Sequence, residues 1–262
     1  MATAYERVRI ARGAKRPTGI DYLQNVFHGF FELHGDRRYA DDPAIVGGLA
    51  YLGATPVTVI AIEKGHTAKE RVQRGFGAAQ PEGYRKALRL MREAEKFHRP
   101  VVCFVDTSGA GCNVGAEERG QGEAIAECLT TMSALQTPVL SILIGEGGSG
   151  GALALAAGDR VWMLENAVYS VISPEGCATI LWKDAAKAEQ AAEELKLTAD
   201  DALALGVVES VLPEADLGEP EFYDALSQRL MREVDALTEM PIQELLSARY
   251  ARFRRFGGEA QR

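Results

Sequence analysis

Two consecutive segments, each an apolar run followed by a glycine-rich turn and a helical pattern, constrain the fold of this chain most. Residues 101–105 (Val-Val-Cys-Phe-Val) lead into Asp-Thr-Ser-Gly-Ala-Gly at 106–111. Residues 139–144 (Val-Leu-Ser-Ile-Leu-Ile) lead into Gly-Glu-Gly-Gly-Ser-Gly-Gly at 145–151. Apolar strands separated by helices are typical of a mainly parallel sheet covered on both faces. We therefore predict an α/β fold.

The rest of the chain extends this pattern. Apolar residues recur at helical spacing in five further segments: residues 21–34, 84–98, 116–135, 152–157 and 185–197. Residues rich in β-formers predict a hairpin or adjacent strands at 45–52 and 57–62, a strand at 160–164 and a last strand ending near 212. From residue 219 onward the composition is helical. A chain of 262 residues then accommodates one domain at 21–215, an N-terminal extension at 1–20 and a helical tail at 216–262 that packs on the domain or on a partner.

Composition excludes several classes of function. The net charge of −8 argues against nucleic-acid binding, which depends on a basic surface. No stretch approaches the roughly 20 apolar residues of a membrane span, and the start lacks the apolar run of a secretory signal. The four cysteines form no C-x-x-C pair, so no zinc ribbon is expected. We expect a soluble, cytoplasmic protein without a metal site.

Charge is nevertheless uneven along the chain. Residues 64–92 contain eight basic side chains and only two acidic ones. Such a segment is compatible with ordinary solvated charge, with contacts to the phosphates of coenzyme A, or with docking of an acidic partner. The sequence does not separate these alternatives.

The glycine turns themselves indicate a kind of chemistry. Glycines between a buried strand and a helix leave backbone N–H groups free to point outward, and the lack of a Cβ lets a ligand atom reach them. Such donors stabilise negative charge that develops on a carbonyl oxygen. The alternative is that the glycines only permit tight packing of strand against helix.

A dinucleotide-binding fingerprint is a competing interpretation of the second turn. Gly145, Gly147 and Gly150 follow a strand with the required spacing, and Glu165 ends the next strand. Only residues 152–158 separate the last glycine from the charged pair that opens that strand, which is too few for the usual crossover helix.

A nucleophile elbow is the other competing interpretation, because Ser149 lies within a G-x-S-x-G pattern. In α/β-hydrolases the catalytic histidine follows the serine. All histidines of this chain precede it: His28, His34, His66 and His98. An α/β-hydrolase arrangement is therefore excluded.

Five blocks carry a resemblance to a known family. They are A-D-D-P-A-I-V-G-G (40–48), P-E-G-Y-R-K-A-L-R-L-M (81–91), G-A-E-E-R-G-Q (115–121), I-G-E-G-G-S-G-G-A-L (144–153) and Y-S-V-I-S-P-E-G (169–176). In this order they resemble the alpha-type carboxyltransferase subunits of bacterial acetyl-CoA carboxylases, over residues 21–213.

The resemblance implies a crotonase-like (ClpP/crotonase) fold of repeated β-β-α units with flanking helices. It also implies transfer of a carboxyl group from carboxybiotin to acetyl-CoA, giving malonyl-CoA for fatty acid synthesis. The expected partners are a beta-type subunit in an α2β2 assembly, the biotin carboxyl carrier protein and biotin carboxylase. Biotin would be attached to the carrier and not to this chain, which has no Met-Lys-Met site.

The same resemblance assigns residues. The amides of Gly150 and Gly151 would hold the ureido oxygen of biotin, with Gly148 and Ser149 beside the substrate. Gly109 and Ala110 would form the opposite wall. Arg119 is a further candidate, for holding the carboxylate.

The first turn departs from the family pattern. Where the family often has D-T-P-G-A-Y-P-G, this chain has Asp-Thr-Ser-Gly-Ala-Gly-Cys-Asn at 106–113. Loss of two prolines is expected to loosen this turn. Two other hypotheses stay open at this point: a crotonase-type carboxyltransferase or decarboxylase subunit that uses a different acyl group, and a non-catalytic scaffold whose glycines only pack.

Overall fold

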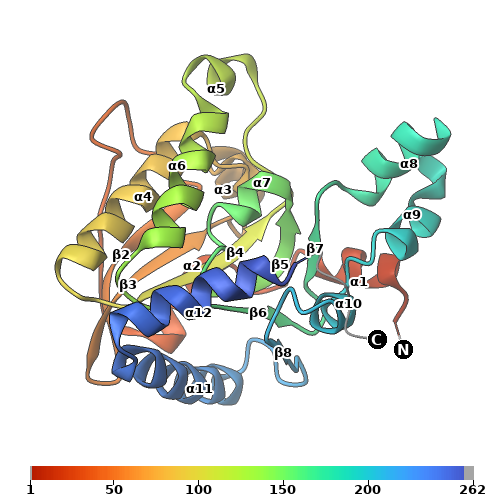
Figure 1. Ribbon diagram of the computed structural model, residues 1–262. Helices are drawn as coiled ribbons and strands as arrows, with labels where there is room; N and C mark the ends of the chain where they lie inside the picture. The colour runs from red at the N-terminus through yellow and green to blue at the C-terminus, as the bar shows by residue number, and fades with distance from the viewer. Residues whose placement is uncertain (1, 257–262) are drawn as a thin grey trace.

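A mixed sheet of eight strands runs through the part of the chain that the computed structural model describes, residues 2–256 (Figure 1). The strand order is β1-β2-β3-β4-β5-β6-β8, and β7 pairs with β5. The strands are β1 (His28–Glu32), β2 (Ile45–Leu52), β3 (Thr55–Ile62), β4 (Val101–Thr107), β5 (Val139–Gly148), β6 (Arg160–Leu164), β7 (Val168–Ser170) and β8 (Ser210–Leu212).

The predicted strands are present with the predicted pairing. β2 and β3 form an antiparallel hairpin, and β3, β4, β5, β6 and β8 are parallel neighbours. Every residue of β4 is buried. A strand buried on both faces is a continuous apolar run, as expected for a parallel sheet.

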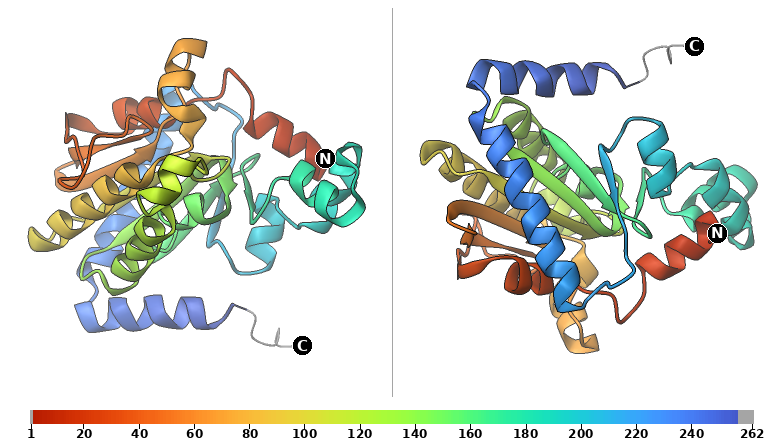
Figure 2. Two further views of the ribbon diagram at one scale, coloured as in Figure 1. Left: turned by 90° about the horizontal axis from the view of Figure 1, so that it is seen from above. Right: turned by 90° about the horizontal axis from the view of Figure 1, so that it is seen from below.

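Helices cover both faces of this sheet (Figures 1 and 2). On one face α4 (Pro81–Lys96) and α6 (Gln121–Ala134) pack side by side, and α12 (Ile242–Arg254) contacts α6. On the other face α2 (Gly19–Val26) packs against the strands and against α11 (Pro220–Glu239). Buried apolar side chains of α11, including Leu230 and Val234, belong to the same core as β4 and β5.

Four predicted elements need correction. The helix predicted at 152–157 is α7 (Ser149–Leu153), which begins three residues earlier and ends at Leu153. The helix predicted at 21–34 ends at Val26, because the chain then forms β1 and pairs with β2. The helix predicted at 116–135 is two helices, α5 (Val114–Glu118) and α6, separated where Gly120 takes a left-handed conformation. The second glycine turn begins later than predicted, because β7 pairs with residues 146–148 and extends β5 to Gly148.

An arm projects from the sheet at its β7 side (Figures 1 and 2). We use "the arm" for residues 174–194, which contain α8 (Pro174–Trp182), the short 3-10 helix η2 (Ala185–Lys187) and α9 (Ala188–Glu194). The sequence predicts a helix at 185–197 but not α8. The N-terminal helix α1 (Ala4–Ala11) packs against α9, and α10 (Ala199–Ala204) leads back to β8.

The remaining short helices lie between β3 and α4. They are α3 (Ala68–Gln73) and η1 (Gly75–Gly77). Across residues 2–256, none of the helices combines the length and apolar character needed to cross a membrane.

Candidate active site

The two glycine turns meet at one edge of the sheet. β4 and β5 are parallel neighbours, so both turns follow carboxyl ends of strands on the same side, and Thr107 pairs with Gly147. α7 (Ser149–Leu153) begins directly after β5. A Cβ on Gly148 would lie 2.2 Å from the carbonyl oxygen of Ser108. The turns therefore contact each other through their backbones.

Gly151 makes the second part of this contact. A Cβ there would lie 2.6 Å from the amide nitrogen of Ala110 and 2.8 Å from the hydroxyl of Tyr84. Tyr84, on α4, is fully buried, and its hydroxyl has no hydrogen-bond partner among the described residues. Burial raises the pKa of Tyr84 well above its ordinary value. The sequence alone did not single out Tyr84, which forms the floor beneath Gly151.

Several amides at this contact are available to a ligand. Within residues 2–256, the N–H groups of Ala110, Gly150 and Gly151 donate to no backbone or side-chain acceptor. The N–H of Gly109 is different, because it donates to the Thr107 hydroxyl at 3.0 Å, which in turn donates to the Gly109 carbonyl at 2.8 Å. Gly109 therefore shapes the turn, and Ala110 carries the free donor on that side.

An apolar hollow of about 300 Å³ adjoins the second turn. Leu153, Tyr169 and Val171 form its apolar lining, with Ser149, Gly150 and Ser170 at its edge. The space beside Gly150 is open, since a Cβ there would meet only Ile125, at 3.7 Å. A ligand in this hollow would have an apolar wall on one side and the Gly150 backbone on the other.

A largely buried cluster of three charged side chains lies where the two turns begin. The Lys64 ammonium lies 2.6 Å from Asp106 Oδ1 and 3.2 Å from Glu146 Oε2. Burial alone would lower the pKa of Lys64, but the carboxylates of Asp106 and Glu146 outweigh it and hold that pKa above its ordinary value. Lys64 is therefore charged at neutral pH. Sequence reasoning counted Lys64 only as part of a basic segment and did not single out the two acids.

The N-terminal segment is tied to the same cluster. Arg12, just after α1, donates to Glu146 at 2.7 Å and to Glu175 on α8 at 2.7 Å. Arg16 donates to the carbonyl of Ile144 in β5 at 2.6 Å and makes two hydrogen bonds to Glu214. The predicted extension at 1–20 thus contacts the strand that carries the second turn.

Arg119 is engaged within the chain. Its guanidinium makes two hydrogen bonds to Glu82, at 3.0 and 3.2 Å, and one to Gln80 at 3.3 Å. It also lies 4.9 Å from the centre of the Tyr39 ring. These contacts hold the junction of α5 and α6 against α4.

The basic segment at 64–92 does not form one surface. Lys86 is buried and Lys64 is half-buried, each in an ion pair, and Arg71, Arg74 and Arg85 donate to backbone carbonyls. Most of its charge therefore holds loops in place. The dinucleotide interpretation of the second turn also fails, because Gly145 and Gly147 lie inside β5 and α7 has only five residues.

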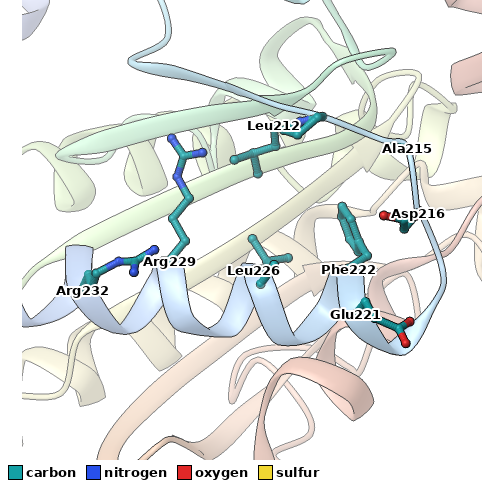
Figure 3. Close-up of a pocket in the computed structure, with 10 residues that line it drawn as sticks. Leu212, Ala215, Asp216, Glu221, Phe222, Leu226, Arg229 and Arg232 are labelled. Atoms are coloured by element: carbon teal, nitrogen blue, oxygen red, sulfur yellow. The ribbon is translucent and has the colours of Figure 1, made fainter.

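A second apolar hollow, of about 320 Å³, lies between β8 and α11 (Figure 3). Leu212, Phe222 and Leu226 line it, and Arg229 stands at one end with its guanidinium 4.8 Å from the centre of the Trp162 ring. No residue of the glycine turns lines this hollow. It takes no part in the site at the turns.

The sequence as a whole matches a known family. A family model described as "Acetyl co-enzyme A carboxylase carboxyltransferase-like" covers residues 1–257. The acetyl-coenzyme A carboxylase carboxyl transferase subunit alpha of Ruminiclostridium cellulolyticum is 58% identical over 255 residues, which are 97% of this chain and 98% of that protein. A protein of Natranaerobius thermophilus named as carboxyl transferase subunits beta/alpha is 53% identical over 97% of this chain and 43% of its own length.

Solved structures share the fold at lower identity. A transcarboxylase 12S structure matches 84% of this chain and 42% of that chain with a TM-score of 0.68 at 19% identity. A chain of a Pseudomonas malonate decarboxylase hetero-tetramer matches 91% of this chain and 98% of that chain, with a TM-score of 0.66 at 18% identity. These neighbours confirm the predicted crotonase-like fold. The chain belongs to the acetyl co-enzyme A carboxylase carboxyltransferase-like family, as an alpha-type subunit.

Proposed function

We propose that this chain is the carboxybiotin-binding half of an acetyl-CoA carboxyltransferase, and that it acts with a beta-type subunit to give malonyl-CoA. One observation carries the proposal of a binding site: Gly150, whose N–H is free, lines an apolar hollow of about 300 Å³, and the free N–H of Gly151 follows it in the chain. A small fused ring with one strongly polar oxygen has the chemistry that such a hollow would hold. The names of the alpha-type relatives support the reaction.

When bound, carboxybiotin supplies the carboxyl group, and negative charge develops on its ureido oxygen as that group leaves. In our proposal the amides of Gly150 and Gly151 donate to this oxygen, with the Ala110 amide as a third donor beside them. Fixed donors of this kind are worth about 10²–10³-fold in rate each. Leu153, Tyr169 and Val171 would exclude water from the ring, which strengthens these hydrogen bonds.

We assign the binding of acetyl-CoA to the partner subunit. The beta/alpha relative joins both types of subunit in one chain, which supports a beta-type partner for this one. An α2β2 assembly, a separate biotin carboxyl carrier protein, biotin carboxylase and a cytoplasmic location complete the proposal.

The other proposed site residues differ in their exposure and in their contacts. Ser149 is exposed at the edge of the hollow and can contact the ring. Gly148 serves the backbone contact with Ser108, since even a Cβ there would lie 2.2 Å from the Ser108 carbonyl oxygen. A role for Arg119 in holding the carboxylate stays a prediction, and it would require the guanidinium to release Glu82.

The test is decarboxylation of malonyl-CoA with free biotin as acceptor. It compares this chain alone, the beta-type subunit alone, their mixture, and the mixture with Gly150→Ala. The added methyl group meets only Ile125 at 3.7 Å, so the variant should fold, yet the methyl stands at the edge of the hollow beside the amides. We expect activity in the wild-type mixture only, and at least a roughly tenfold loss in the variant, because its methyl group hinders the approach of the ligand oxygen to amides that are worth about 10²–10³-fold in rate each.

Gly122→Ala on α6 is the matched control, because a Cβ there has no neighbour within 4 Å and lies outside the site. Gly151→Ala is less informative, since its Cβ would push against the Ala110 amide and so disturb the turn itself. Full activity of Gly150→Ala would rule out the proposed binding at these amides. Activity with another carboxylated acyl-CoA, but not with malonyl-CoA, would instead favour the alternative acyl group.

A further inference from the structure

The ammonium of Lys64 lies at the point where both glycine turns begin. Asp106 is the first residue of the first turn, and Glu146 directly precedes Gly147 and Gly148 in the second glycine run. The exposed fractions of the three side chains are 17%, 6% and 12%, so the ion pairs are shielded from water. Lys64 itself follows β3, the strand next to β4. One cation therefore bridges the ends of three neighbouring strands.

Here the regular hydrogen-bond ladder between β4 and β5 does not fix the distance between the two turns. The register between β4 and β5 shifts between Val105 and Thr107. The carboxylate of Asp106 replaces the missing ladder contact, because its Oδ1 accepts the N–H of Glu146 at 2.8 Å. A Cβ on Gly145 would lie 2.3 Å from the same oxygen, so the carboxylate packs directly on β5.

Lys64 is what allows this arrangement to hold two negative charges. The carboxylates of Asp106 and Glu146 share the same ammonium within a poorly hydrated space, where like charges repel strongly if nothing neutralises them. Arg12 compensates Glu146 in part, at 2.7 Å, but has no hydrogen bond to Asp106. Without Lys64, the two carboxylates would move apart, and the turns that follow them would move as well.

We propose that Lys64 is a positioning residue for carboxyl transfer: it holds Asp106 and Glu146 together and so fixes the distance between the Ala110 amide and the amides of Gly150 and Gly151. The inference rests on the proposed function of those amides. It makes Lys64 more than a stabilising ion pair, because displacement of a reacting group by about 1 Å can lower a rate by roughly 100-fold.

A second buried ion pair supplies the control. Arg249 on α12 is fully buried and donates to Asp159 at 2.7 and 2.8 Å, and Asp159 in turn accepts the N–H of Val139 at the start of β5. This pair is at the opposite end of the same strand. Arg249→Met should lower stability, as Lys64→Met should, but it leaves the carboxyl ends of β4 and β5 unchanged.

The first measurement is amide hydrogen exchange of the whole chain, followed by mass spectrometry. In Lys64→Met, peptides that cover 107–111 and 147–151 should exchange at least roughly tenfold faster than in the wild type, since the turns lose their common anchor. In Arg249→Met these peptides should keep the wild-type rate relative to the rest of the sheet. This readout does not depend on any catalytic activity.

The second measurement is the malonyl-CoA assay with the beta-type subunit. Lys64→Met should lower kcat about tenfold or more while KM for biotin changes less than about twofold, because the donors act mainly on charge that develops during the reaction. Lys64→Arg should restore most of kcat, since the longer cation can extend into the adjoining cavity of about 160 Å³. Lys64→Gln, which removes the positive charge but keeps a polar side chain between the two carboxylates, is the second variant if Lys64→Met does not fold.

Unchanged kcat in Lys64→Met or Lys64→Gln would overturn the inference, as would an equal loss of kcat in Arg249→Met. An inactive wild-type mixture would count against the proposed function and not against the positioning of the turns. In that case unchanged exchange at 107–111 and 147–151 would overturn the positioning role separately.

Discussion

Lys86 is fully buried beneath the loop before β2, where its ammonium lies 2.5 Å from Asp41 Oδ1 and donates to the Asp42 carbonyl at 2.8 Å. Burial alone would raise the pKa of Asp41. Hydrogen bonds from Lys86 and from the Gly35 amide outweigh it and lower that pKa from 3.8 to about 2. The ionised carboxylate is therefore favoured in the folded state.

This pair gives a prediction for acid stability. A lowered pKa contributes stability that is present above 3.8 and is lost as the pH falls toward about 2. Asp41→Asn should therefore lower Tm at pH 7, and the difference from the wild type should shrink as the pH approaches 2. Thermal unfolding at a series of pH values measures this difference. Asp224→Asn, at an exposed position on α11, should follow the wild type throughout; a pH-independent effect of Asp41→Asn would contradict the prediction.

The meeting of the two glycine runs was predictable because its signal is local. Gly150, Gly151, Gly109 and Ala110 stand in glycine-rich runs after apolar strands, and the fold does bring these runs together. Lys64 was not predictable as their anchor, because its contact with Glu146 spans 82 positions of the chain. The only local signal was one acidic residue in each glycine run, Asp106 in the first and Glu146 in the second. Nothing in the sequence showed that Thr107 would occupy the amide of Gly109.

At the scale of elements, the segment that leads from α1 to α2 is held by arginines. Arg16 is 5% exposed, and its partner Glu214 is 6% exposed. Burial alone would lower the pKa of Arg16, but the Glu214 carboxylate outweighs it, so that pKa is raised. The guanidinium also donates to the Ile144 carbonyl, which links the N-terminal segment to β5.

Arg16→Ala should therefore destabilise the chain strongly. Breaking a buried pair by removing one partner costs about 3–5 kcal/mol, which for a domain of this size lowers Tm by roughly 10 °C. Arg9→Ala, at an exposed position of α1, should change Tm by less than about 2 °C. Calorimetry of the two variants measures the contrast, and similar Tm values would show that the segment contributes little to the fold.

Helices and strands were predictable where a hydrophobic pattern repeats over many residues. They were not predictable where pairing with a distant strand determines the secondary structure. The helix near 84–98 and the hairpin at 45–62 are present because their patterns repeat over many residues. The segment 28–32 looks helical by spacing, but pairing with β2 makes it a strand. Gly29, whose φ is +64°, is the one glycine that could have signalled the change. Local patterns cannot report a partner strand that lies further along the chain.

At the scale of the whole molecule, stability is unevenly distributed. The sheet and its covering helices share one large core, whereas the arm rests on two small clusters of buried residues. One cluster joins α1 and α9 through Val8 and Ala192, and the other joins α8 and α9 through Cys177 and Ala191. Ile180 and Leu181 of α8 remain exposed, at 70% and 61%.

The arm should consequently open before the sheet does. Few buried contacts mean a low free energy of local opening, so amides of α8 and α9 should exchange at least about 100-fold faster than those of β4 in the isolated chain. Hydrogen exchange with mass spectrometry measures both regions in one experiment, with α4 as an internal reference on the main core. Equal protection of the arm and β4 would show that the molecule opens only as a whole.

The central sheet and its covering helices were predictable from the sequence, whereas part of the arm was not. Apolar strands with helices between them indicated a parallel sheet, and the family resemblance indicated the crotonase-like fold, which the solved neighbours confirm. Within the arm, α8 escaped prediction because it begins in a segment that shows little amphipathic pattern. Its position follows from contacts with α1, more than 160 residues earlier, such as the Tyr5 hydroxyl bonded to Glu175.

The backbone contact between the two glycine turns has a consequence for inhibitor design. An inhibitor that hydrogen-bonds only to the amides of Ala110, Gly150 and Gly151 would depend on groups that no substitution can remove, short of proline. Gly148 and Gly151 have no room for a Cβ, so substitutions there would damage the turn before they displaced the compound. Resistance would have to arise at Gly150 or in the lining of the hollow, a small set of positions at which escape could be monitored in advance.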